Sequence, residues 1–220
     1  MIFYHSSKQL IDKPIVKGSN PTNDYGPSFY LTMDKEAAKS WACKNDSLGI
    51  LNKYSIKSGR FQSMRILDLT DKKKYNILNW LAILMHFREL GTSFINKNGP
   101  ALKWLNKYYV DVDEYDIVIG FRADDSYFRF PVRFVTNELS FDDLEEIYLS
   151  GDLGKQYAFM SKRAIVALKF ESFIECEPSF IGHYHSIVIE ATQHFDELLN
   201  RPRDPKKTYI FDLMRKDDEH

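Results

Sequence analysis

The sequence predicts an α+β domain, because segments with strand character stand near both ends of its first 176 residues and helical segments lie between them. Residues 50–56 show the alternation of a half-buried strand. Residues 75–90 instead carry apolar side chains at helical spacing, and Gly91 is placed to end that helix. The chain has 220 residues, of which 44% are hydrophobic, so it can bury one sizeable core. We therefore expect one domain over residues 1–176 and a helical extension over residues 177–220, packed on it or beside it.

Two predicted strands near the N-terminus each carry a polar ring where a ligand can reach it. His5 ends a short apolar run and hydroxyl residues follow, so its imidazole is available for a hydrogen bond. Tyr30 is the central residue of an apolar run of three, and strand alternation turns its ring to the face opposite its neighbours. Thr32 is then placed to N-cap a helix over residues 33–42. Taken alone, each ring is better explained by a structural role, so order and context carry the functional interpretation.

The remaining elements follow from the same patterns. Further strands are expected at residues 65–69, 116–120 and 169–175, and further helices at residues 102–105, 144–149, 161–168 and 187–199. A linker and a final helical or extended piece complete the extension at residues 201–207 and 209–214. Ser140 is predicted to cap the helix that follows it. The adjacent acids Asp124 and Asp125 are predicted to cap another helix, with a metal or substrate role as the alternative.

Composition and absent motifs exclude several classes of protein. A net charge of −1 argues against a protein whose affinity comes from a global field that binds polyanions. Cys43 and Cys176 are too few for a disulfide framework. The first residues lack the basic segment and apolar core of a signal peptide, and no apolar run approaches the roughly 20 residues that span a bilayer. The P-loop, Rossmann, zinc-protease and nucleophile-elbow motifs are all absent. We expect a cytoplasmic protein with no membrane contact.

Two further groups of side chains have open interpretations. His86 and Arg88 either face a ligand cleft, where an arginine suits a pyrophosphate, or belong to a solvated helix face, which is the more common case. His183 and His185 hint at a metal site, but they are two residues apart and no third ligand is nearby in the sequence. We therefore expect no metal.

Three segments carry a resemblance to a known superfamily. They read Phe-Tyr-His-Ser-Ser at residues 3–7, Gly-Pro-Ser-Phe-Tyr-Leu-Thr at residues 26–32, and Gly-Lys-Gln-Tyr-Ala-Phe-Met-Ser at residues 154–161. In this order they resemble the His-Tyr-Glu pattern of the ADP-ribosyltransferases, with Gln156 at the third position. Over about residues 1–170 the chain is similar to a bacterial subfamily of uncharacterised domains, related to the poly-ADP-ribose polymerases and diphtheria toxin, in which glutamine is expected at that position.

The resemblance implies a split antiparallel β-sheet with peripheral helices and the activity of an NAD-dependent mono-ADP-ribosyltransferase. NAD would be the co-substrate, pinched across the split sheet. By resemblance, His5 binds the adenosine ribose, and Ser6 and Ser7 line the nicotinamide end. Tyr30 stacks on the nicotinamide ring, and Gln156 holds the 2'-hydroxyl of the nicotinamide ribose. His5, Tyr30 and Gln156 are therefore the expected catalytic residues.

The same resemblance implies a bacterial toxin that modifies a protein or nucleic-acid acceptor and that is encoded beside a small antitoxin protein. The chain departs from the superfamily pattern in three places: Ser6 replaces a glycine, residues 26–28 lack a second glycine before the motif aromatic, and Gln156 offers a dipole where a glutamate offers a charge. Three alternatives remain open. They are a binding module for NAD or ADP-ribose, an NAD glycohydrolase without an acceptor, and a non-enzymatic interaction protein whose aromatic-rich surface binds a partner.

Overall fold

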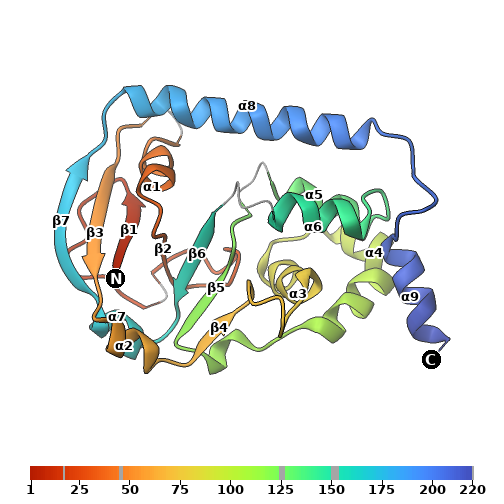
Figure 1. Cartoon of the computed structure of the whole chain (residues 1–220), viewed down its shortest axis with the longest axis horizontal. Coiled ribbons are helices and arrows are strands. Elements are labelled where there is room, and N and C mark those ends of the chain that lie inside the picture. The colour runs from red at the N-terminus through yellow and green to blue at the C-terminus, as the bar shows by residue number, and fades with distance from the viewer. Residues whose placement is uncertain (17, 45–46, 124–126, 150–153, 220) are drawn as a thin grey trace.

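Two β-sheets with helices packed around them make up the computed structural model of the chain, which describes residues 1–16, 18–44, 47–123, 127–149 and 154–219. The sheets have the strand orders β1-β3-β7 and β2-β6-β5-β4 (Figure 1). The strands are β1 (Ile2–Ser7), β2 (Phe29–Leu31), β3 (Ile50–Ser55), β4 (Ile66–Asp68), β5 (Ile117–Phe121), β6 (Lys155–Phe159) and β7 (Lys169–Glu175). The α-helices are α1 (Lys35–Ala42), α2 (Ser58–Gln62), α3 (Ile77–Phe87), α4 (Thr92–Leu105), α5 (Arg129–Val135), α6 (Phe141–Leu149), α7 (Lys162–Ala167), α8 (Ser179–Leu199) and α9 (Ile210–Asp218).

The two sheets are joined by a backbone bridge between β1 and the residue after β2. The N–H of Tyr4 donates to the carbonyl of Thr32 at 2.8 Å, and the N–H of Thr32 donates to the carbonyl of Tyr4 at 3.0 Å. The predicted α+β class is confirmed. The expectation of a wholly antiparallel arrangement is wrong at one edge, where β4 pairs with β5 in parallel. Parallel neighbours need a long crossover, and α3 and α4 lie between these two strands in the chain.

The four-stranded sheet is buried on both faces, which explains the continuous apolar run of β5. Val118 belongs to a hydrophobic cluster with α3 and the other helices, whereas Ile117 and Ile119 belong to a second cluster shared with β1 and β3. Figure 1 shows α3 to α6 on one side of this sheet and the three-stranded sheet on the other. Strands β2 and β6 are therefore fixed in place by hydrophobic packing on both faces of their sheet.

Two helix boundaries differ from the prediction. Asp34, and not Thr32, caps α1, since its carboxylate accepts two first-turn N–H groups at 2.9 and 3.0 Å. Thr32 is held instead in the bridge between the sheets. Helix α3 ends at Phe87, and Gly91 is the N-cap of α4 rather than the end of α3. Because α3 ends at Phe87, Arg88 has an extended backbone and its side chain reaches Asp24.

Other predicted boundaries are confirmed. Ser140 and Ser161 each accept a hydrogen bond at 3.1 Å from the N–H three residues later, as helix caps do. Strand β7 covers the predicted residues 169–175. The predicted capping acids Asp124 and Asp125 lie outside the described residues, and α5 begins at Arg129, later than expected.

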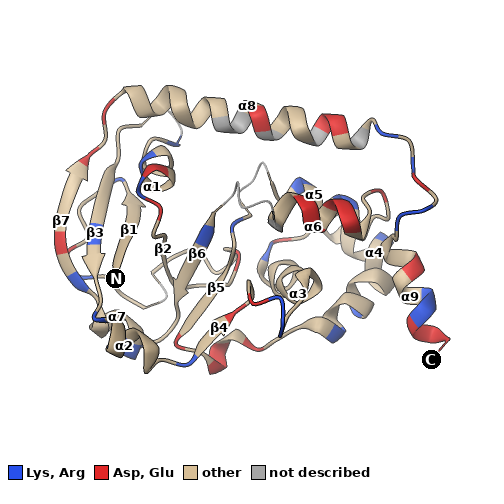
Figure 2. Cartoon of the chain, viewed as in Figure 1, with Lys and Arg blue, Asp and Glu red and all other residues tan. Residues whose placement is uncertain are grey.

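The last elements run across the molecule. Helix α8 begins well before the expected residue 187, so His183 and His185 lie on a helix. It passes from the end of β7 to the far helices, and α9 then lies beside α4, where the indole N–H of Trp104 donates to Asp217 at 2.8 Å (Figure 1). Figure 2 shows acidic and basic residues interspersed over the elements. Among the described residues, no helix combines the length and apolar character needed to cross a membrane.

Candidate functional site

A cavity of about 1010 Å³ opens between β1, β2, α1 and β6. Small-molecule and cofactor sites are typically about 300–1,000 Å³, so this space is at the large end of that range. His5, Ser6, Tyr30 and Gln156 all line it. The structure therefore brings together the three residues expected to be catalytic, although they lie on three strands of two different sheets.

The imidazole of His5 is held by the neighbouring strand. Its Nδ1 lies 2.7 Å from the carbonyl oxygen of Tyr30, and its ring stacks on Phe29 with the centroids 4.3 Å apart. A carbonyl only accepts, so Nδ1 carries the proton in the neutral ring and Nε2 is an acceptor. Burial lowers the pKa of His5 below its ordinary value, against a weaker raising effect of the Tyr30 carbonyl. His5 thus offers the cavity a neutral acceptor at neutral pH.

This lowered pKa makes stability depend on pH in a defined direction. Unfolded His5 binds a proton below about pH 6.5, whereas folded His5 does so only at lower pH, so the free energy of unfolding falls as the pH drops through 6.5. Each unit of pKa difference corresponds to about 1.4 kcal/mol. Urea unfolding at pH 7.5 and 5.5 checks this, with His5→Gln as the control that lacks the titrating group. Equal losses of stability in the two proteins would show that His5 is not held neutral.

Tyr30 is anchored at both its backbone and its hydroxyl. Its backbone pairs with Ala158 of β6, and its hydroxyl donates to the carbonyl of Gly26 at 2.5 Å and accepts from the N–H of Tyr25 at 3.0 Å. Burial raises the pKa of its phenol. As predicted from the alternation, Phe29 and Leu31 are buried while Tyr30 is half-buried. The hydroxyl of Tyr30 therefore holds the 25–30 loop together, while the residue also lines the cavity.

The two serines are placed less well than the resemblance implies. Ser6 lines the cavity, but its hydroxyl donates to the carbonyl of Ala38 on α1. Ser7 is not among the lining residues, and its hydroxyl accepts a hydrogen bond from the N–H of Gln9 at 3.2 Å. Ser7 is the last residue of β1, and the chain bends directly after it. That Ser7 lines the nicotinamide end of the site stays a prediction.

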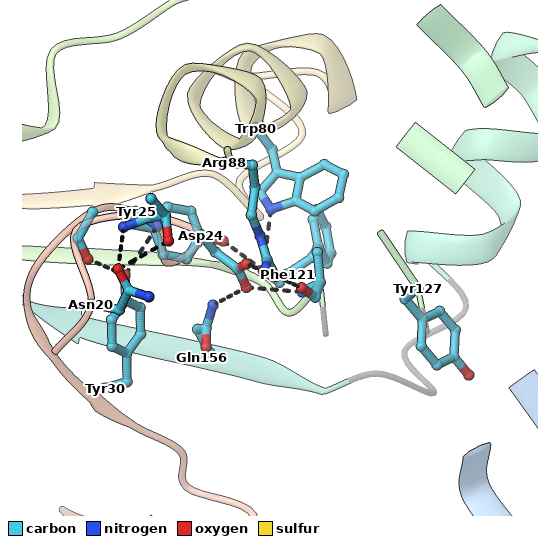
Figure 3. A network of polar contacts seen from close by, with 12 residues as sticks. Asn20, Asp24, Tyr25, Tyr30, Trp80, Arg88, Phe121, Tyr127 and Gln156 are labelled. Atoms are coloured by element: carbon cyan, nitrogen blue, oxygen red, sulfur yellow. Dashed lines mark hydrogen bonds and ion pairs between the residues drawn. The ribbon is translucent and has the colours of Figure 1, made fainter. Parts of the chain in front are cut away.

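Gln156 is bound to a buried carboxylate that sequence reasoning missed. Its Nε2 donates to Oδ2 of Asp24 at 2.8 Å, and the backbone N–H of Ala123 donates to the same oxygen at 3.0 Å. A guanidinium nitrogen of Arg88 donates to Oδ1 of Asp24 at 2.6 Å and also to the carbonyl of Ala123. Figure 3 shows this network and the amide oxygen of Gln156 directed away from Asp24. Asp24, Arg88 and Gln156 all line the cavity.

The contacts around Asp24 also account for the positions of the Arg88 and Tyr25 side chains. Arg88 was expected either at a pyrophosphate or on a solvated face, but its side chain is 18% exposed and pairs with Asp24, while the guanidinium also lies 5.0 Å from the ring of Phe128. Burial raises the pKa of Asp24, and Arg88, Ala123 and Gln156 oppose that shift. Tyr25 is fully buried and donates to the carbonyl of Phe121 at 2.6 Å, directly over Gly120, where a Cβ would collide with its ring. This packing fixes the loop that carries Asp24.

Basic side chains outnumber acidic ones around the cavity. Among the described residues, its wall contains the lysines and arginines Lys13, Lys44, Arg88, Arg122 and Lys155, against the acids Asp12, Asp24 and Glu89. The guanidinium of Arg122 lies 3.0 Å from the centre of the Trp41 ring, and Lys44 lies 5.2 Å from it. The cavity thus combines aromatic surface with positive charge, which favours an anionic ligand that contains planar rings. Within the described part of the chain, no group of three or more His, Cys, Asp or Glu residues is arranged to hold a metal ion.

The fold and the cavity define an α+β protein with a basic, aromatic-lined site where its two sheets meet. Residues 1–170 match the family described as a protein of unknown function, DUF3990, and the chain belongs to that family. The matched segment includes every strand of the four-stranded sheet and every residue of the cavity wall. A search of curated proteins found no match, and neither did a search of solved structures.

Proposed function

We propose that this protein binds NAD in the cavity and transfers its ADP-ribose to a macromolecular acceptor. The observation that carries the proposal is the convergence of His5, Tyr30 and Gln156 on one cavity from β1, β2 and β6. These are the three positions at which the sequence resembles the ADP-ribosyltransferase pattern, and the cavity lies where two sheets part, as a split-sheet site requires. The cationic wall supports the same ligand, because NAD carries a pyrophosphate between two ring systems.

Each residue suits one part of the dinucleotide. The unprotonated Nε2 of His5 accepts a hydrogen bond from a hydroxyl of the adenosine ribose. Tyr30 offers its ring to nicotinamide, since its hydroxyl is already bonded within the 25–30 loop. The amide oxygen of Gln156, which points away from Asp24, accepts from the 2'-hydroxyl of the nicotinamide ribose.

The reaction breaks the bond between nicotinamide and C1' of its ribose. Nicotinamide leaves with the bonding electron pair, the ribose acquires oxocarbenium character, and a nucleophile of the acceptor bonds to C1' and loses its proton. Dipoles aimed at the ribose and exclusion of water lower this barrier. The amide of Gln156 supplies such a dipole, and the carboxylate of Asp24 behind it polarises the amide further.

One observation favours a second candidate, an NAD or ADP-ribose binding module. Gln156 is neutral, and the carboxylate that it contacts, Asp24, is buried behind it rather than facing the ribose. The toxin role and the antitoxin partner are part of the first proposal and follow from the resemblance alone. A cytoplasmic location is part of the same proposal and rests on the cysteine content and the lack of a signal-peptide pattern.

Incubation of the purified protein with NAD labelled on the adenylate, with and without cell lysate, separates the candidates. Release of nicotinamide together with label on a macromolecule supports the transferase. Nicotinamide with free ADP-ribose in both mixtures indicates a glycohydrolase, and calorimetric binding without release indicates the binding module. Neither binding nor release overturns the proposal in favour of an interaction protein.

Tyr30 provides a test of the stacking role in particular. Tyr30→Phe keeps the ring and removes the two hydroxyl bonds to Gly26 and Tyr25, which costs about 1 kcal/mol of stability per bond. Tyr30→Ala also removes the ring, so we expect it to abolish NAD cleavage while Tyr30→Phe retains most of it. Nicotinamide release by the two folded variants decides this. Equal rates would mean that the ring does not contact the nucleotide.

A further inference from the structure

We propose that Asp24 is a positioning residue that holds the amide of Gln156 in one orientation, with its oxygen facing the bound ligand. The catalytic consequence rests on the proposed function, whereas the contact itself does not. Asp24 belongs to none of the strands that carry the three-residue pattern, and nothing in that pattern assigns it a role. Its place between Arg88 and Gln156 is a property of the fold (Figure 3).

The orientation follows from the donors and acceptors of the network. Each contact that the structure gives to the Asp24 carboxylate is a donor: Arg88 on Oδ1, and Ala123 N–H and Gln156 Nε2 on Oδ2. An ionised carboxylate accepts only, so the Gln156 amide must turn its NH₂ group toward Asp24. Its oxygen is then directed away, and an acceptor is what a ribose hydroxyl and a developing positive charge require.

Asp24 is itself immobilised. The residue is 6% exposed, and its carboxylate is clamped between the guanidinium of Arg88 and a backbone N–H after β5. Tyr25, the next residue, is fully buried and bonded to the carbonyl of Phe121. The carboxylate therefore has no room to follow a rotating amide, and it fixes Gln156 from behind.

Removing the charge of Asp24 should release this constraint. In Asp24→Asn, the new amide faces donors on both sides, since Arg88 lies at one oxygen position and Gln156 and Ala123 lie at the other. Whichever way the introduced asparagine side chain turns, its NH₂ group meets a donor. One outcome is a flipped Gln156 that presents its own NH₂ group to the ligand.

We expect Asp24→Asn to lower kcat for nicotinamide release by about a hundredfold while NAD affinity changes much less, because a misplaced group costs mainly the chemical step. Asp116→Asn is the matched control. Asp116 is another buried aspartate, 4% exposed, which is bonded to Ser161 and Arg163 and is not part of the cavity wall. Both variants should lose stability, but only Asp24→Asn should lose kcat.

Gln156→Glu tests the contact without any activity measurement. It places a second carboxylate at the position of the donated N–H, where the present side chain lies 2.8 Å from Asp24, so the pKa of the introduced carboxyl group rises well above the ordinary glutamate value of about 4.3. Because the folded form then binds the extra proton over a pH range in which the unfolded form does not, stability falls as the pH rises through that range. Each unit of the shift lowers the melting temperature by about 3–5 °C relative to the parent protein.

Melting temperatures of the parent and Gln156→Glu from pH 4 to 8 therefore decide the contact. Curves that converge at acid pH and separate above it support the proposal, and parallel curves overturn it. Parental kcat in a folded Asp24→Asn protein also overturns it. If the parent releases no nicotinamide, the transferase proposal fails, and the melting curves still show whether Asp24 holds Gln156.

Discussion

Replacing Gln156 by alanine is expected to lower the rate of nicotinamide release by about 10²–10³-fold, the usual cost of losing one preorganised group at a developing charge. Gln156 lies half-buried on β6, where Ala is tolerated sterically, so the protein should fold. The backbone of β6 keeps its pairing with β2 and β5, and the binding contacts of His5 and Tyr30 remain. NAD affinity should therefore change far less than the rate.

Gln9→Ala is the matched control for this variant, because Gln9 lines the same cavity and, among the bonds of the described residues, takes part through its backbone, which the substitution keeps. Single-turnover measurements at saturating NAD separate the chemical step from binding. If Gln156→Ala and Gln9→Ala both cleave NAD at the parental rate, Gln156 is only a strand residue and the third catalytic group lies elsewhere.

Replacing Arg88 by methionine is expected to have the largest effect on stability, a loss of about 3–5 kcal/mol in the free energy of unfolding. Methionine preserves much of the side-chain volume but leaves the Asp24 carboxylate buried without its cation. The equivalent change at Arg163, whose side chain is 56% exposed beside Asp116, should cost only about 0–1 kcal/mol. Urea unfolding of the two variants at neutral pH provides the measurement.

The double variant Arg88→Met, Asp24→Asn shows whether the unpaired charge of Asp24 causes that loss of stability. Removing the charge of Asp24 together with its partner should recover part of the stability lost in Arg88→Met, because an unpaired buried charge costs more than a neutral polar group. If Arg88→Met and Arg163→Met proved equally stable, the Asp24 pair would not be the buried interaction that the structure indicates.

Local patterns were sufficient to predict much of this fold. The alternation around Tyr30, the cap at Ser140, the helix that follows Ser161 and the strand before Cys176 depend on residues that are close in sequence, and the structure confirms them. The motif residues His5, Tyr30 and Gln156 were identified through the resemblance of their short segments to the ADP-ribosyltransferase pattern, and they share one cavity. Each of the three matches lies within a segment of five to eight residues, so it can be recognised without knowledge of the fold.

The Asp24 network was not predictable in this way. Its members come from a loop, the end of α3 and β6, so their meeting depends on how β2 and β6 pair and on where α3 ends. Gly91 predicts a helix that continues to Leu90, with Arg88 inside it. In the structure α3 ends at Phe87, and Arg88 lies outside the helix, where its side chain reaches Asp24. The proximity of Asp24 to Gln156, which no sequence pattern indicates, predicts that the stability of a Gln156→Glu variant depends on pH.

A crystal structure of the protein with a non-hydrolysable NAD analogue tests most directly whether NAD occupies the cavity between the two sheets. We predict the analogue's two riboses within about 2.6–3.2 Å of His5 Nε2 and of the Gln156 amide oxygen, with nicotinamide against the Tyr30 ring. An analogue bound at another surface, or an unoccupied cavity at saturating concentration, would contradict this account.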